Sequence, residues 1–226
     1  MNDCRVPVIG FVGGVGSGKS SLSAAIGRRL RCVLLDADRE GHAVLALPAI
    51  QSQLHQTFGD SIFDKNGAVS RPTLGKLVFG NEPIDRERRL QLEAIVHPEI
   101  RRRLSARIDQ HRAAVDVDLI LLDAAVMLES GWSGICDLIV FVDTPESLRL
   151  SRVQQSRGWS QDEFARREAS QWPLDRKRQA ADIVVHNDTE IDAVAQNLLT
   201  ELLVRFPQLA SQFQRPETCP VAQAPA

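Results

Sequence analysis

A glycine-rich segment near the start of the sequence carries its clearest chemistry. It reads Gly13-Gly14-Val15-Gly16-Ser17-Gly18-Lys19-Ser20 and satisfies in full the pattern GxxxxGK followed by Ser or Thr. An apolar run precedes it and a helical pattern begins near Ser20, which is the context of a phosphate-binding P-loop. Glycines let backbone N–H groups converge on phosphate oxygens, and the following helix adds its positive amino-terminal end.

The polar side chains of this loop predict a site for ATP and Mg²⁺. Lys19 is expected to reach the β- and γ-phosphates, and the Ser20 hydroxyl to coordinate the metal. The loop alone does not separate a kinase from a GTPase or a motor ATPase. A GTPase usually carries Asn-Lys-x-Asp after a later strand, where this chain has Val142-Asp143-Thr144-Pro145. The residues expected to bind the nucleotide are Gly14, Val15, Gly16, Ser17, Gly18, Lys19, Ser20 and Ser21.

Carboxylates close the next apolar run, which ends in Asp36-Ala37-Asp38. Ligands of open parallel sheets bind outside the carboxyl ends of the strands, so both acids should face the same crevice as the loop. Residues i and i+2 of an extended segment point the same way. One carboxylate would orient an acceptor hydroxyl and the other would contact Mg²⁺ through water, with Asp38 as the expected base. The alternative, in which the acids cap the next helix, stays open for Asp38.

Two later apolar runs also end in aspartate. Asp123 closes one of them and resembles the Walker B residue that helps to hold Mg²⁺. The alternative for Asp123 is an ordinary buried strand that happens to end in an acid. Asp143 closes the other run and is expected to order the turn that follows it.

A group of arginines after the fourth apolar run predicts a closing lid. Phosphoryl transfer needs positive charge around the γ-phosphate, and a lid can deliver that charge while it excludes water. Arg149 and Arg152 are three residues apart, so they share a helix face. The alternative is a surface helix with ordinary solvated arginines. The group consists of Arg149, Arg152, Arg157, Arg166 and Arg167.

These groups need a scaffold, and the apolar runs predict it. Short runs rich in Val, Ile and Leu indicate strands buried on both faces, and helical patterns separate most of them. The alternation predicts an α/β protein with a P-loop kinase fold, in which helices flank a five-stranded parallel sheet. The runs cover residues 8–12, 32–35, 119–122, 138–142 and 183–185.

Two helical regions are expected beside this sheet. Residues 41–117 predict an inserted helical lobe that binds substrate, with a solvated helix face over the charged residues 101–111. A helical lid is expected over residues 144–172, with Thr144 as an N-cap before a proline. Ser160-Gln161-Asp162-Glu163 matches a capping box, so two lid helices should join near Gly158.

Composition limits the remaining classes of protein. The 226 residues are 43% hydrophobic and 25% charged with a net charge of −2, which favours a soluble globular chain without a nucleic-acid partner. No apolar run reaches the ~18 residues that span a bilayer, and the opening residues lack the apolar core of a signal peptide. We expect a cytoplasmic monomer or small homo-oligomer, with one domain over residues 1–214 and a disordered tail over 215–226.

The ordered motifs resemble the dephospho-coenzyme A kinase family over most of the chain. The opening strand and double-glycine loop are shared with many kinases, whereas the later elements in this order are much more specific. The matching residues are Ile9 to Ser20, Asp36-Ala37-Asp38 with His42, Gly67 to Arg71 with Leu74, Val78 and Phe79, Leu92-Glu93, His97-Pro98-Glu99-Ile100, Arg149, Arg152, Arg157, Arg167, Gln171, Ala181-Asp182 and Asn187.

The resemblance implies that the chain transfers the γ-phosphoryl group of ATP to the ribose 3′-hydroxyl of dephospho-CoA, the last step of CoA synthesis. It implies that Asp38 accepts or orients the hydroxyl proton, and that Lys19 and Arg152 stabilise the γ-phosphoryl group. Asp36, Arg71 and the inserted lobe would help to bind the acceptor. His97 is kept as a candidate substrate-binding residue, although a packed or capping histidine is expected there rather than a catalyst, and the same holds for His42.

One departure from the family pattern concerns the segment after the third strand. The family usually has Pro-Leu-Leu-x-Glu there, whereas this chain has Ala125-Val126-Met127-Leu128-Glu129. Two other functions stay open: a P-loop kinase for a nucleoside or a sugar acid, and a nucleotide-binding regulator that has lost phosphoryl transfer. The presence of Lys19, Ser20, Asp38 and the lid arginines together argues against that loss.

Overall fold

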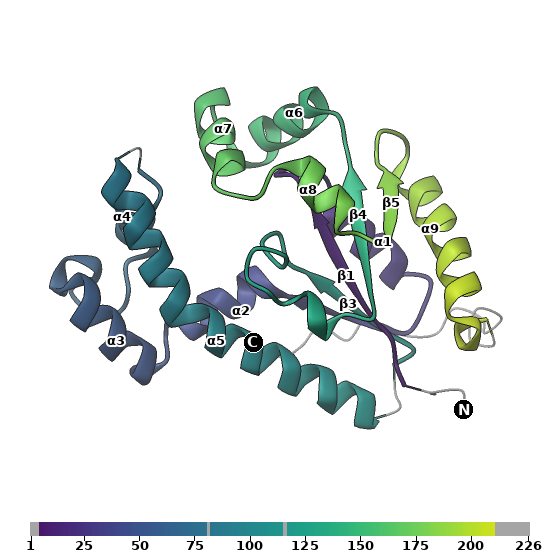
Figure 1. The fold of residues 1–226 in the computed structure, drawn as a ribbon, viewed down its shortest axis with the longest axis horizontal. Coiled ribbons are helices and arrows are strands. Elements are labelled where there is room, and N and C mark those ends of the chain that lie inside the picture. Colours follow the sequence, from purple (N-terminus) through teal and green to yellow (C-terminus); the bar gives the residue numbers. More distant parts are fainter. Residues whose placement is uncertain (1–4, 81, 115–116, 211–226) are drawn as a thin grey trace. The chain divides into compact units, whose positions relative to one another are not determined.

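A parallel sheet forms the centre of the computed structural model, which describes residues 5–80, 82–114 and 117–210. Its five strands lie in the order β2-β3-β1-β4-β5 (Figure 1). All neighbouring pairs are parallel. Each apolar run predicted as a strand forms one, so the predicted sheet is confirmed. The strands are β1 (Val8–Gly13), β2 (Cys32–Asp36), β3 (Leu119–Asp123), β4 (Leu138–Asp143) and β5 (Ile183–His186).

Helices α1 (Lys19–Gly27) and α9 (Ile191–Arg205) cover one face of the sheet. Phe11 from β1, Leu22 from α1 and Leu198 from α9 meet in this core and are almost fully buried. The central strands have no exposed residue, whereas the edge strands β2 and β5 each have some. The unbroken apolar runs therefore reflect strands that are covered on both faces.

The other face of the sheet is covered by the segment after β3 and by helix α8 (Leu174–Gln179). A Cβ atom placed on Gly10 of β1 would lie 2.6 Å from Met127 Cε and 2.7 Å from Cys136 Sγ. The Arg178 guanidinium of α8 lies 5.3 Å from the centre of the Phe141 ring on β4. Gly10 is needed because this layer approaches the strand so closely.

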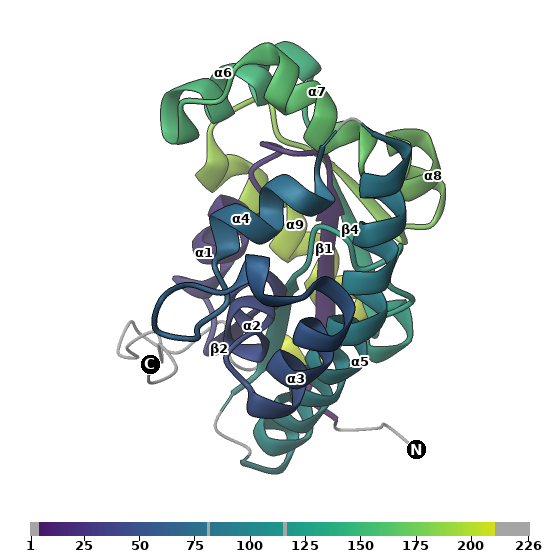
Figure 2. The same cartoon turned by 90° about the vertical axis from the view of Figure 1, so that its left-hand side faces the viewer.

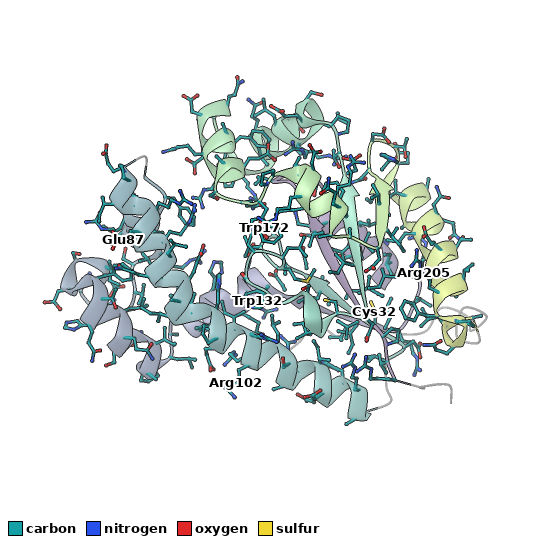
Figure 3. All side chains as sticks on the ribbon, in the orientation of Figure 1. Cys32, Glu87, Arg102, Trp132, Trp172 and Arg205 are labelled. Carbon is teal, nitrogen blue, oxygen red and sulfur yellow. The ribbon has the colours of Figure 1, made fainter. Side chains whose placement is uncertain are left out.

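The chain divides into two compact units, of which the second is Ala37–Ser105. It contains α2 (Ala37–Val44), α3 (Pro48–Phe58), the 3-10 turn Asp60–Ile62, α4 (Arg71–Val78) and most of α5 (Pro83–Ala114). This unit begins and ends earlier than the expected lobe over 41–117. The exposed side chains of Arg101 and Arg102 in α5 agree with a solvated helix face. Figure 3 shows Arg102 projecting from this helix.

The first unit holds the sheet together with α6 (Glu146–Arg157) and α7 (Gln161–Ala169). These two helices lie beyond the carboxyl ends of β1 and β4 (Figures 1 and 2). Gly158 ends α6 with a φ of 66°, and the Ser160 hydroxyl accepts a hydrogen bond from the backbone N–H of Glu163 at 3.2 Å. The predicted join and helix cap are confirmed.

The prediction for the start of α6 was wrong by one residue. Pro145 occupies the N-cap position, and the helix begins at Glu146. The Thr144 hydroxyl donates instead to the carbonyl oxygen of Ser17 at 2.9 Å. The predicted tail over 215–226 lies outside the described residues. Among the helices described, none combines the length and apolar character that a membrane crossing requires.

Candidate active site

The P-loop joins β1 to α1 through a backbone that favours glycine at three positions, the first of which is Gly13, with a φ of 152°. Gly16 has a φ of 73° and Gly18, the N-cap of α1, has a φ of 87°. A Cβ atom on Gly16 would lie 2.5 Å from the Arg149 carbonyl oxygen, and one on Gly18 would lie 2.4 Å from Asn187 Nδ2. Both positions are therefore restricted by their backbone and by their neighbours. The turn leads directly into a helix amino terminus, where anions bind.

The Lys19 ammonium group lies against the backbone of the P-loop. Its Nζ donates hydrogen bonds to the carbonyl oxygens of Gly13 at 3.3 Å and Gly14 at 3.1 Å. The side chain is buried, with 8% of its surface exposed. These contacts hold a positive charge at the mouth of the loop, where the phosphates of a nucleotide would enter.

One carbonyl group anchors the loop to two other segments of the first unit. The Ser17 carbonyl oxygen accepts hydrogen bonds from Asn187 Nδ2 at 2.7 Å, Thr144 Oγ1 at 2.9 Å and Arg152 Nη1 at 3.4 Å. Thr144 follows β4 and Asn187 follows β5. Sequence reasoning missed the anchoring role of both residues. Their position directly after a strand was the available signal, but their partner is far away in the chain.

The residues predicted to bind Mg²⁺ come together at the carboxyl edge of the sheet. The Ser20 hydroxyl donates a hydrogen bond to a carboxylate oxygen of Asp123. Asp36 lies directly beside Asp123 in the register of β2 and β3. Hydroxyl and carboxylate oxygens are the ligands that Mg²⁺ prefers, so this edge fits the metal that accompanies ATP.

The predicted arrangement of Asp36 and Asp38 requires a correction. Asp36 is the last residue of β2, but α2 begins at Ala37, so Asp38 lies in the first turn of a helix. The two carboxylates therefore do not alternate along an extended strand. Helix formation starts this early because Ala37 and the residues after it tolerate helical geometry, and an acid in the first turn is favoured by the helix dipole. Both side chains are exposed.

The five lid arginines fall into different environments. The Arg149 side chain is 3% exposed and forms an ion pair with Glu168 of α7. Its Nε donates to the Thr144 carbonyl oxygen at 3.1 Å and its Nη1 to that of Val15 at 3.4 Å. Arg149 thus fixes α6 on the P-loop. Arg152 is half-buried, and its Nη2 also donates to the Asn187 carbonyl oxygen at 3.2 Å.

The other three arginines surround a tryptophan and a glutamate near the surface of the lid. Arg157 and Arg167 lie 4.8 Å and 5.4 Å from the centre of the Trp159 ring. Arg166 and Arg167 both form ion pairs with Glu163. The hydrogen bond from Arg167, supported by the charges of both arginines, holds the pKa of Glu163 below its usual value, although burial opposes this shift. These contacts stabilise α7 itself.

The remaining predicted site residues lie in the second unit. Arg71 is the exposed first residue of α4. His97 lies within α5, where burial lowers the pKa of its imidazole. Asp38 belongs to this unit as well. The structure therefore brings together Lys19, Ser20, Asp123 and Arg152 within the first unit, and the roles of Asp38, Arg71 and His97 stay predictions.

The first unit contains a P-loop, the Ser20 hydroxyl and Asp123 carboxylate beside it, and helices α6 and α7 beyond it. Together these features define the first unit as a P-loop kinase. The sequence pattern of the family described as dephospho-CoA kinase matches residues 7–193. The chain therefore belongs to the dephospho-CoA kinase family.

Individual relatives support this assignment. The dephospho-CoA kinase of Carboxydothermus hydrogenoformans is 35% identical, over 87% of this chain and 93% of the relative. The Thermus thermophilus protein TT1252 has a similar crystal structure, with a TM-score of 0.74, 28% identity and coverage of 89% and 98% of the two chains. A dephospho-CoA kinase from Campylobacter jejuni shares the fold, with a TM-score of 0.60, 20% identity and coverage of 86% and 96%.

Proposed function

We propose that this chain phosphorylates the ribose 3′-hydroxyl of dephospho-CoA with ATP, and releases coenzyme A and ADP. The observation that carries the proposal is the hydrogen bond between Ser20 and Asp123, in a chain of this family. It places a P-loop hydroxyl and a strand-end carboxylate at one point. That pairing is expected of a phosphotransferase that uses a nucleotide with its metal.

The residues of the first unit account for the donor half of the reaction. Backbone N–H groups between Gly14 and Ser21 would bind the phosphates, with Lys19 beside the γ-phosphoryl group. Ser20 and Asp123 would hold Mg²⁺, which supplies positive charge to the phosphate oxygens when bound. Arg152 would add a further positive charge after it releases the Ser17 and Asn187 carbonyl oxygens to which it donates.

The acceptor half rests on Asp38, Arg71 and His97 of the second unit and on Asp36 at the end of β2 in the first unit. The attacking oxygen of the ribose forms a bond to the γ-phosphorus as the bond to the β–γ bridging oxygen breaks, and ADP leaves. Asp38 would take or orient the proton of that hydroxyl group. Asp36, Arg71 and His97 are the candidates that bind dephospho-CoA. We also propose that the protein is located in the cytoplasm.

An assay of ADP release tests the proposal against its alternatives. Purified protein receives ATP and Mg²⁺ with dephospho-CoA, a nucleoside mixture or gluconate. Stimulation by dephospho-CoA alone is the expected result. Stimulation by nucleosides or gluconate alone would indicate another small-molecule kinase, and ATP binding without turnover on any acceptor would indicate the regulator.

Two variants test the assigned roles in the same assay. Lys19→Ala and Asp38→Asn should each lower kcat by at least about 100-fold, because one removes charge stabilisation and the other proton handling. Asp109→Asn is the matched control, since Asp109 is an exposed acid of α5 with no assigned role. Turnover near that of the unsubstituted chain in Asp38→Asn would show that another carboxylate is the base.

A further inference from the structure

A fully buried lysine contacts the segment that follows β3, two residues after Asp123. Lys177 of α8 has no exposed surface. Its Nζ donates to the Ala125 carbonyl oxygen at 2.7 Å and to Gln171 Oε1 at 2.8 Å, and lies 2.8 Å from Glu129 Oε1. An ammonium group has three donors, and here three oxygens surround it. They come from two segments, the one after β3 and the one between α7 and α8.

Glu129 joins the same two segments a second time. Its Oε1 accepts a hydrogen bond from the backbone N–H of Trp172 at 2.8 Å. Figure 3 shows Trp172 beside the sheet. Within the part of the chain that the structure describes, Glu129 Oε2 is buried without a hydrogen-bond partner. The carboxylate therefore depends on Lys177 for the compensation of its charge.

The pair extends into a series of alternating charges that reaches the P-loop. Glu168 of α7 interacts electrostatically with Lys177 and forms the ion pair with Arg149. Arg149 in turn donates to the carbonyl oxygen of Val15. Positive and negative groups thus follow one another from the P-loop, through the lid, to the segment after β3. The order is Arg149, Glu168, Lys177 and Glu129.

Lys177 also contacts the segment that directly follows the predicted metal ligand Asp123. Ala125, whose carbonyl oxygen Lys177 binds, follows Asp123 by two residues, and Asp123 accepts the hydrogen bond from Ser20. The intervening Ala124 is fully enclosed, with 1% exposure. A shift of the Ala125 carbonyl group would therefore be transmitted to the Asp123 carboxylate over one buried residue.

We propose that Lys177 is a positioning residue for Mg²⁺ binding: by holding Ala125 and Gln171 together, it fixes Asp123 against Ser20 and links that edge to the lid. The proposal rests on the proposed function, which makes Asp123 and Ser20 ligands of the metal. It adds a residue that touches neither nucleotide nor metal. Groups behind metal ligands orient them, and their loss typically lowers metal affinity by about 10- to 100-fold.

The use of a charged residue at this position needs a reason, because packing alone does not explain it. Burial lowers the pKa of Lys177, and the hydrogen bond and charge of Glu129 together with the charge of Glu168 oppose that effect. A buried ion pair is often no more stable than apolar side chains of similar size. An ammonium group can hold three oxygens in fixed directions, whereas an apolar side chain can hold none. We infer that a lysine is present at position 177 because these three oxygens have to be held in fixed directions.

Calorimetric titration of the full chain with ADP, in EDTA and in Mg²⁺, tests the proposal without reference to turnover. The unsubstituted chain should bind ADP more tightly when Mg²⁺ is present. In Lys177→Met, ADP affinity in EDTA should stay within about twofold of that of the unsubstituted chain. The factor by which Mg²⁺ increases ADP affinity should fall by about 10-fold or more. Lys65→Met is the matched control, since Lys65 is exposed, and its gain should not change.

The concentration of folded protein, measured by circular dichroism, separates positioning from mere stability. A variant that is less stable but shows the full gain from Mg²⁺ per folded molecule would overturn the proposal. If Lys177→Met does not fold, Gln171→Met and the double variant Lys177→Met with Glu129→Gln replace it, and an unchanged gain in both would equally overturn it. If the unsubstituted chain shows no gain from Mg²⁺, the proposed function fails first and this role fails with it.

Discussion

At the scale of single residues, a sequence motif predicts which reaction a site could carry out. It does not predict which atoms each side chain contacts or how deeply it is buried. The strand–loop–helix arrangement around the P-loop was predictable, because the glycine spacing, the apolar run before it and the helical pattern after it all indicate that turn. The five arginines looked equivalent in the sequence, yet Arg149 is buried on the P-loop and Arg157 lies over a tryptophan. Asn187 and Lys177 could not be assigned, because their partners lie far away in the chain. Burial, which depends on the whole fold, decides between these uses.

The contrast between Arg149 and Arg152 gives a prediction about stability and turnover. Arg149→Met should lower the free energy of unfolding by about 3 kcal/mol, because it breaks the ion pair with the partly buried Glu168 carboxylate. Arg152→Met should lower it by less than about 1.5 kcal/mol, since it removes only hydrogen bonds to carbonyl groups. Its kcat should fall by about 100-fold if Arg152 acts on the γ-phosphoryl group.

Urea unfolding and steady-state kinetics of Arg149→Met and Arg152→Met test the predicted losses of stability and the predicted fall in kcat. The free energies come from the unfolding midpoints and the slopes of the transitions. The matched substitution to methionine keeps the volume of the side chain similar in both proteins. Equal losses of stability would show that burial does not separate the two arginines, and full turnover in Arg152→Met would remove it from the active site.

At the scale of elements, the sequence predicted what local chemistry determines. The five strands follow from unbroken apolar runs, and the end of α6 and the start of α7 follow from Gly158 and Ser160. Two misplaced features, at Thr144 and at Asp38, lie where a helix begins within three residues of the end of a strand. At Thr144 a tertiary hydrogen bond to Ser17 takes the hydroxyl that could have capped the helix. At Asp38 the helix begins without the extended residues that the sequence suggested.

The cap of α7 provides a test at this scale. Ser160→Ala removes the oxygen that accepts the Glu163 N–H, and such losses cost about 1 kcal/mol. Because α7 has only nine residues, the change should appear first as faster amide hydrogen exchange in 161–169. Gln161→Ala is the control, since Gln161 is exposed and its side chain forms no cap. Equal exchange in the two variants would mean that the Glu163 ion pairs, not the cap, hold the helix.

At the scale of the whole molecule, the order of the strands was beyond the sequence. Alternating strands and helices predict a parallel sheet, but β3 lies between β2 and β1 although it follows them in the chain. The limits of the second unit were equally inaccessible, since α5 continues without a break past Ser105. The environment of the cysteines is also a product of the complete fold. Cys32 (Figure 3) and Cys136 are free thiols within the first unit.

These thiols make the stability of the molecule sensitive to alkaline pH. Burial, with a smaller contribution from Asp118, raises the pKa of Cys32 to about 12. Burial also raises the pKa of Cys136 to about 12, and the nearby carboxylates of Asp137 and Asp182 outweigh the opposing charge of Arg112. An unfolded thiol ionises near pH 8.5. Between about pH 9 and 12 the folded chain therefore binds more protons than the unfolded chain, and its stability falls as the pH rises.

The prediction concerns the slope of the free energy of unfolding against pH. Each buried thiol should lower the free energy of unfolding by about 1.4 kcal/mol per pH unit across this window. Cys32→Ala should lose one such contribution, so its urea midpoint should fall less steeply between pH 9 and 10.5 than that of the unsubstituted chain. The lowered pKa of Lys177 acts in the opposite direction, because there the unfolded chain binds more protons, but its effect is the same in both proteins and cancels in the comparison. Parallel slopes would mean that Cys32 ionises in the folded protein as readily as in the unfolded one, and that the core around β2 admits water.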